Sequence, residues 1–173
     1  MVNAPKVKVS KEEFTQVLYY WLSQRLTKQA IKQTAKDLDF KIKSNEDFNK
    51  ILQELFALNM WLIVRACEKV FDDIDKRNEC LDMFHRLVYQ GHTGGPEENF
   101  GNWMTSIGMK YVEYSQAMET EQPPSPLWVL AKVINKNLFG EVKKDVILQV
   151  NISAYVGIPY ETLEDLIKKY DIE

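Results

Sequence analysis

The feature that most constrains this chain is a helical segment, residues 44–71, that has no continuous polar face. Its apolar side chains recur at helical spacing, and between Leu55 and Val64 the only polar residue is Asn59. A helix that is apolar on all sides is stable only when other elements cover it on more than one side. We therefore expect residues 44–71 to form the central helix of a bundle.

Two serines mark positions where helices begin. Ser44 is followed three residues later by Asp47, and Ser10 is followed at the same spacing by Glu13. This spacing is typical of a capping box, in which the hydroxyl accepts from a free backbone N–H and the acid reaches back to the cap. The apolar face of the helix that begins at Ser10 can extend to residue 38. The sequence leaves open whether residues 10–38 form one helix or two.

Glycine and proline divide the remainder of the chain into further helices. Composition favours a single globular domain, since the 173 residues are 45% hydrophobic and 27% charged. The predicted fold class is therefore all-α, a single-domain bundle of about six to seven helices around the central helix, closed by a C-terminal helical hairpin. Residues 1–9 are predicted to be a flexible N-terminal tail, residues 10–173 the domain, and residues 141–173 the hairpin. Three further helices are predicted at about residues 75–90, ending at Gly91, at Pro96–Met118, and at residues 126–138, ending at Gly140.

The densest group of acidic residues lies where the helix from Ser44 reaches residues 72–78, a stretch in which the apolar periodicity lapses. The lapse suggests a break, but the sequence leaves that open. On an unbroken helix the acids of this stretch would share one side, and carboxylates are the ligands that hard divalent cations prefer. A metal- or ligand-binding bundle enzyme that uses the acidic cluster 68–85 is therefore one alternative function. Its candidate metal ligands are Asp72, Asp75, Glu79, Asp82 and His85.

Small residues repeat every seven positions in the helix predicted for residues 96–118. Gly101, Gly108 and Ser115 fall on one strip of that helix. A glycine inside a helix costs about 1 kcal/mol relative to alanine, so two of them at one phase suggest that something approaches the backbone closely. The candidates are another helix of the same chain, a second copy of the chain, or a ligand. In the preceding glycine-rich segment, His92 is a candidate member of a pocket.

The C-terminal segment 147–170 resembles a helix-turn-helix motif. Small residues lie where that motif places its turn, notably Ser153 and Gly157. The resemblance implies a DNA-binding regulator. However, the segment that would read the bases carries Glu161, Glu164 and Asp165, and DNA binding depends on neutralising phosphates. We therefore expect a plain helical hairpin and no nucleic-acid partner, with DNA binding as an alternative.

Composition also limits the compartment and the chemistry. The N-terminus has no apolar signal segment, and the longest apolar run is far shorter than the roughly 18–20 residues that span a bilayer. We expect a cytoplasmic protein with no membrane association, in which Cys67 and Cys80 are free buried thiols. The lysines at positions 28, 32 and 36 share one side of a helix, and we interpret them as a solvated face.

No catalytic or cofactor motif is present, and the chain has only two histidines for acid–base chemistry. We therefore expect a protein without a cofactor and lean against an enzyme. The favoured hypothesis is a non-catalytic interaction or regulatory protein that acts through a helix face. Its expected partner is a second copy of itself, as in a homodimer, or another protein. Such a protein should expose an apolar patch.

Overall fold

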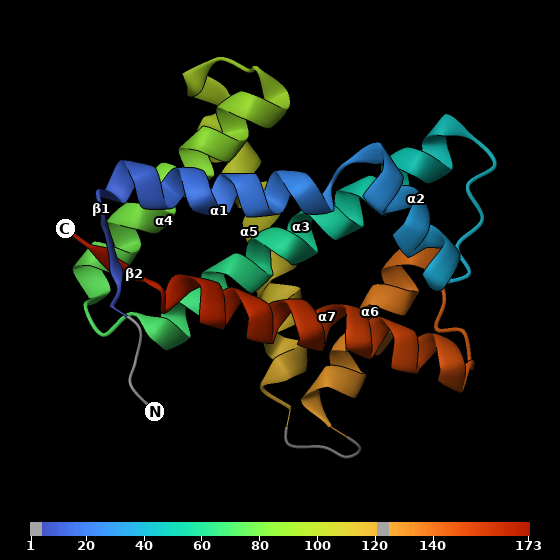
Figure 1. The fold of residues 1–173 in the computed structure, drawn as a ribbon. Helices are drawn as coiled ribbons and strands as arrows, with labels where there is room; N and C mark the ends of the chain where they lie inside the picture. The colour runs from blue at the N-terminus through green and yellow to red at the C-terminus, as the bar shows by residue number, and fades with distance from the viewer. Residues whose placement is uncertain (1–4, 121–124) are drawn as a thin grey trace.

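The computed structural model describes residues 5–120 and 125–173 of the chain, and it confirms an all-α bundle (Figure 1). The described residues form seven α-helices, one short 3-10 turn and two three-residue strands. The helices are α1 (Lys11–Arg25), α2 (Lys28–Asp37), α3 (Asn45–Val70), α4 (Ile74–Thr93), α5 (Phe100–Met118), α6 (Pro126–Phe139) and α7 (Val146–Ile167).

Helix α3 is the centre of the bundle, as the sequence predicts. It contacts α1, α2, α4, α5, α6 and α7, and it passes between α1 and α7 (Figure 1). The side chains of Leu58, Leu62 and Ile63 are between 0% and 1% exposed. Fully burying one such side chain contributes about 1.5–3 kcal/mol, so this single helix supplies much of the hydrophobic stabilisation. Both predicted capping boxes, at Ser10 and Ser44, are formed.

Two questions that the sequence left open about helix boundaries are answered by capping residues. Residues 10–38 form two helices because Thr27 adopts an extended conformation and its hydroxyl accepts from the backbone N–H of Ala30 at 3.2 Å. The helix from Ser44 ends at Val70, and Asp73 caps α4 by accepting from the N–H of Lys76 at 3.0 Å. The lapse in apolar periodicity therefore does mark a break.

Two predicted helix ends are displaced in the glycine-rich segment between α4 and α5. Gly91 lies inside α4, whose last residue is Thr93. The next residue, Gly94, caps the helix with a φ of 58°. This left-handed conformation favours glycine, so Gly94 has the role predicted for Gly91. Pro96 precedes a 3-10 turn, Glu97–Asn99, and α5 begins only at Phe100.

The predicted C-terminal hairpin within residues 141–173 is wrong, because α7 is one helix of 22 residues. Asp145 caps it by accepting from the N–H groups of Ile147 and Leu148. Its buried residues, from Leu148 to Ile167, form one face that packs on α3 and α6 and keeps the helix continuous through Pro159. The helical pair that closes the bundle is instead α6 with α7.

The predicted flexible tail is wrong for residues 7–9. Strand β1 (Val7–Val9) pairs in parallel with strand β2 (Tyr170–Ile172), so the two ends of the described chain lie side by side (Figure 1). The backbone N–H of Val7 donates to the carbonyl of Lys169 at 2.8 Å, and that of Glu173 donates to Val9 at 3.0 Å. Residues 1–4 of the predicted tail and residues 121–124, which fall between α5 and α6 in the sequence, lie outside the described part of the chain.

Cys67 and Cys80 are free and buried, as predicted. Burial raises the pKa of the Cys67 thiol to about 12, so it stays protonated and unreactive at neutral pH. Among the described helices, none combines the length and the apolar character needed to cross a bilayer.

Candidate functional site

A buried carboxylate lies on the inner side of α3, directly before the apolar stretch that begins at Leu55. Glu54 is only 6% exposed. Its Oε1 accepts from the Tyr114 hydroxyl and from Asn137 Nδ2, both at 2.9 Å, and its Oε2 accepts from Lys110 Nζ at 3.0 Å. These donors come from α5 and α6, so one α3 side chain links three helices. Burying a charge is tolerable only with such partners.

The groups that donate hydrogen bonds to Glu54 keep their protons at neutral pH. Burial opposes a charge on Lys110, but attraction to Glu54 and Glu113 outweighs it and raises the pKa of Lys110 above its ordinary value. Burial first, and the Glu54 carboxylate second, raise the pKa of Tyr114 well above its ordinary value. Both groups therefore remain protonated at neutral pH. A carboxylate saturated by such donors suits binding and positioning better than general acid–base catalysis.

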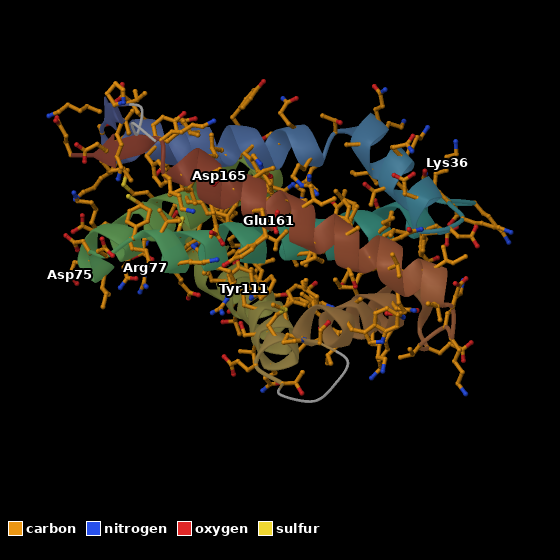
Figure 2. All side chains as sticks on the ribbon, turned by 60° about the horizontal axis from the view of Figure 1, so that its bottom comes forward. Lys36, Asp75, Arg77, Tyr111, Glu161 and Asp165 are labelled. Atoms are coloured by element: carbon orange, nitrogen blue, oxygen red, sulfur yellow. The ribbon has the colours of Figure 1, made fainter. Side chains whose placement is uncertain are left out.

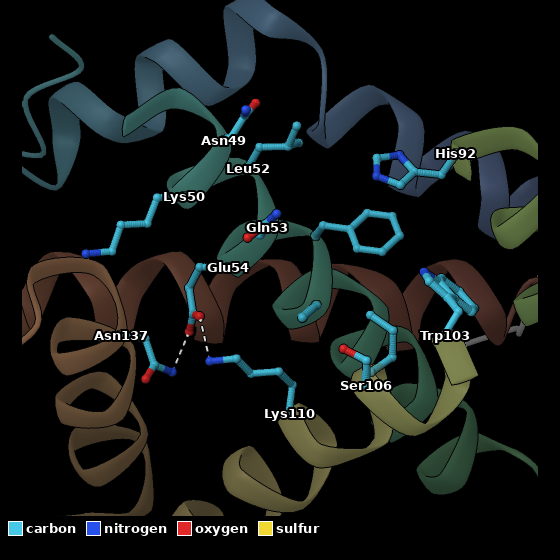
Figure 3. Close-up of a pocket in the computed structure, with 13 residues that line it drawn as sticks. Asn49, Lys50, Leu52, Gln53, Glu54, His92, Trp103, Ser106, Lys110 and Asn137 are labelled. Carbon is cyan, nitrogen blue, oxygen red and sulfur yellow. Dashed lines mark hydrogen bonds and ion pairs between the residues drawn. The ribbon is translucent and has the colours of Figure 1, made fainter. Parts of the chain in front are cut away.

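A hollow of about 700 Å³, which we call the Glu54 pocket, lies beside this cluster (Figure 3). The amides of Asn49, Gln53 and Asn137 border it together with Glu54 and Lys110. Aromatic rings form another part of its wall. The His92 ring stacks on Phe56 with centroids 4.3 Å apart, and the Trp103 ring lies 6.3 Å from Phe56. Burial lowers the pKa of His92, so its ring is neutral at physiological pH.

A second hollow of about 690 Å³, the lysine pocket, adjoins the first. Leu52 and His92 border both pockets. The polar wall of the lysine pocket includes Lys28, Lys32, Lys43, Ser44 and Asn45. We call the two adjoining hollows the α3 cleft, because both lie along the N-terminal half of α3. The cleft contains His92, the residue of the glycine-rich segment that the sequence offered as a pocket member.

The structure does not gather the predicted metal ligands into one site. Among the described residues no group of three or more histidine, cysteine and acidic side chains is placed to hold a metal ion. The break after α3 separates Asp72 from the acids of α4, and Glu79 forms an ion pair with Lys11. Asp72, Asp75 and Asp82 are exposed.

His85 is buried away from any metal site and acts as a packing residue. Its Nδ1 lies 2.7 Å from the carbonyl of Leu81, and its Nε2 lies 3.1 Å from the Tyr111 hydroxyl (Figure 2 labels Tyr111). Burial lowers the pKa of His85. A neutral ring with both nitrogens engaged by the protein has no position left for a ligand.

The small residues on the strip of α5 have different surroundings in the structure. A Cβ added at Gly101 or Gly108 would meet no atom of another described element within 4 Å, so none of the described elements packs closely there. Ser115 lies deeper, and its hydroxyl accepts from Trp61 Nε1 at 3.0 Å. Close helix packing within the chain therefore does not explain the two glycines.

An exposed apolar face lies on α7. Val146, Ile147, Val150 and Ile158 are 66%, 73%, 52% and 64% exposed, and Ala154 is exposed between them. We call these five residues the α7 stripe. Of the ten large hydrophobic residues that are exposed in the described chain, four belong to this stripe. A smaller exposed pair, Met109 and Val112, lies on α5.

Sequence reasoning missed the Glu54 cluster and the α3 cleft. The one available signal was an acidic residue between Leu52 and Leu55, in a helix predicted to be covered on several sides. Its partners are 56 to 83 residues away in the chain, and no local pattern reveals such pairings. Comparison with protein-family models, with curated proteins and with solved structures finds no match for this chain.

Proposed function

We propose that this protein is a non-catalytic interaction protein that binds a second copy of itself through the α7 stripe. The observation that supports this proposal is the contiguous exposed apolar surface. Ile147, Val150, Ala154 and Ile158 follow one another at spacings of three and four residues, so they line one side of the helix. Contiguous apolar patches of this kind are uncommon on monomeric proteins and typical of interfaces.

The stripe also has a shape into which a partner can fit. A hollow of about 500 Å³ lies beside it, between α7 and the α1–α2 region, and is lined by Leu38, Ala154 and Ile158 among others. Ala154 is the smallest side chain of the stripe and lies near its middle. A small residue at that place allows a second helix to approach closely.

Charge complementarity favours an antiparallel pair of identical chains. Suppose that each Ile147 lies over Ile158 of a second copy. The same register then places Lys144, three residues before Ile147, beside Glu161, three residues after Ile158. Both charged residues are exposed and neither has an ion pair within the described chain. A twofold axis makes this contact occur twice.

The DNA-binding alternative receives no support from the geometry. It needs a separate recognition helix, whereas α7 is continuous, and the exposed half of α7 beyond Ile158 carries Glu161 and Asp165 (Figure 2). These acids would repel phosphates. The metal-enzyme alternative lacks a gathered ligand set in the described chain.

Sedimentation velocity over a concentration series tests the proposal. We expect the unaltered protein to associate into dimers, and Ile147→Lys or Ile158→Lys to weaken association by tenfold or more, because either places a charge in an apolar contact. Val112→Lys is the matched control on the exposed face of α5 and should leave association unchanged.

A charge exchange tests the register. Lys144→Glu alone should weaken the dimer, and adding Glu161→Lys should restore it. A protein that stays monomeric at high concentration would contradict the proposal. Association that Val112→Lys abolishes and Ile147→Lys does not would move the interface to α5.

A further inference from the structure

The lysine pocket gathers positive charge from two separate segments of the chain. Lys28 and Lys32 project from successive turns of α2, and Lys43 comes from the segment that leads into α3. On the sequence alone the α2 lysines are indistinguishable from a solvated face. The fold adds Lys43 to the wall of the same hollow. A merely solvated face of α2 would not need a lysine from a second segment.

These lysines are free to bind an external anion. No ion pair in the described chain involves Lys28, Lys32 or Lys43. The same is true of Lys50, which borders the adjoining Glu54 pocket. The whole chain has a net charge of −3, so this positive region is local. The carboxylate that borders the cleft, Glu54, forms an ion pair with Lys110, which also pairs with Glu113.

Asp47, in the first turn of α3, offsets part of the charge of Lys43, but in the described chain no acid forms an ion pair with Lys28 or Lys32. Asp47 accepts from the backbone N–H groups of Lys43 and Ser44, both at 2.9 Å, so it is turned toward the backbone. These hydrogen bonds, that of Lys43 first, lower the pKa of Asp47. Glu46 is exposed and does not border the pocket. Ser44 and Asn45 do border it, and the positive end of a 26-residue helix dipole favours an anion there.

The other half of the cleft offers a surface for a planar ring. His92 borders both pockets and lies flat against Phe56, with 18° between the ring planes, and Trp103 borders the Glu54 pocket (Figure 3). Nucleobases stack favourably on aromatic side chains of this kind, whatever their sequence. The amides of Asn49 and Gln53 supply hydrogen-bond donors and acceptors beside the rings.

We propose that the α3 cleft binds a small organic phosphate that carries a planar ring, of the size of a mononucleotide. The phosphate lies among Lys28, Lys32 and Lys43 at the N-terminus of α3. The ring lies in the Glu54 pocket, beside His92 and Trp103. Because the two hollows adjoin at Leu52 and His92, one ligand reaches both.

Isothermal titration calorimetry with three probes tests the two halves of the site. We expect ATP to bind more tightly than inorganic tripolyphosphate, which lacks the ring, and more tightly than adenosine, which lacks the phosphates. Binding of ATP should weaken as salt rises, because the lysine pocket is open to solvent.

Variants then locate the site. Lys32→Gln with Lys43→Gln should raise the Kd for ATP by tenfold or more, and His92→Ala with Trp103→Leu should remove the advantage of ATP over tripolyphosphate. Lys132→Gln with Lys136→Gln, two exposed lysines of α6, is the matched control and should leave the Kd unchanged. Circular dichroism checks that each variant is folded.

Several outcomes would overturn the proposal. They are the absence of ATP binding, equal weakening by the α6 control pair, and binding of a single-stranded oligonucleotide without binding of ATP. Ile147→Lys should bind ATP like the unaltered protein, so failure of this proposal is distinct from failure of the proposed dimer.

Discussion

At the scale of single residues, the polar side chains inside the apolar helix act as links between helices. Asn59, the one polar residue between Leu55 and Val64, is fully buried. Its Oδ1 accepts from Arg25 Nε of α1 at 2.5 Å, and its Nδ2 donates to the Tyr155 hydroxyl of α7 at 3.2 Å. The Arg25 guanidinium also lies 4.8 Å from the centre of the Tyr155 ring. Asn59 thus joins three helices through directional contacts.

Glu54 is the second polar link, and replacing it should have a measurable effect on stability. Glu54→Ala should lower the free energy of unfolding by about 2 kcal/mol, because it leaves the buried Tyr114 hydroxyl without its acceptor, while Lys110 and Asn137 keep only Glu113. Glu54→Gln keeps the shape of the side chain and one acceptor oxygen, so it should lower the free energy of unfolding by less. Urea unfolding followed by circular dichroism measures both.

The neighbouring residue provides the control for Glu54. Gln53 is exposed on the same turn of α3, and Gln53→Ala should change stability by no more than about 0.5 kcal/mol. Equal effects of Glu54→Ala and Gln53→Ala would mean that the cluster contributes nothing to stability.

At the scale of secondary-structure elements, local capping residues decide where the helices break. Thr27, Ser44, Asp73, Ser125 and Asp145 each supply a side-chain oxygen to a free N–H at the start of a helix. Gly94 and Gly140 end helices in the left-handed conformation. Such signals are short-range, so most of them can be read from the sequence.

Thr27 is the capping residue that divides α1 from α2, and its loss has a measurable effect. Thr27→Ala should lower the free energy of unfolding by about 1 kcal/mol, because the N–H of Ala30 loses its acceptor. Thr27→Ser retains the hydroxyl and should be close to the unaltered protein in thermal or urea unfolding. A loss for serine as large as that for alanine would show that the methyl group of Thr27, and not the cap, is responsible.

Helix α7 illustrates where local signals fail. Ser153 and Gly157 lie where a helix-turn-helix places its turn, and from the sequence they favour a hairpin. Pro159 removes one N–H donor and crowds the carbonyl one turn earlier, whereas the buried residues from Leu148 to Ile167 pack on α3 and α6. The packing of one continuous face outweighs the lost hydrogen bond.

At the scale of the whole molecule, the two ends of the described chain are joined. An isolated pair of strands is at best marginally stable, so β1 and β2 depend on the helices around them. Phe14 of α1 packs edge-on against Tyr170, with ring centroids 6.0 Å apart, and Lys76 Nζ of α4 donates to the carbonyl of Ile172 at 2.6 Å. The strand pair therefore fastens both ends to α1 and α4.

Removing a hydrogen bond between the strands tests this closure. Val7→Pro removes the N–H that donates to Lys169 and should lower the free energy of unfolding by about 1 kcal/mol, whereas Val7→Ala should have little effect. Ile172→Ala should cost about 2 kcal/mol. The double variant Val7→Pro with Ile172→Ala should lose less than the sum, because both changes release the same contact. Strict additivity in chemical unfolding would mean that the strands do not act as one unit.

From the sequence alone we could predict the all-α class, the central position of residues 44–71 and most helix starts. These follow from periodicity and capping, which involve residues a few positions apart. The structure was needed to show that α7 is continuous, that the two ends pair, that Lys43 borders the same hollow as Lys28 and Lys32, and that Glu54 contacts Lys110 and Asn137. Each of these depends on contacts between residues far apart in the chain, whose free energies no local pattern encodes.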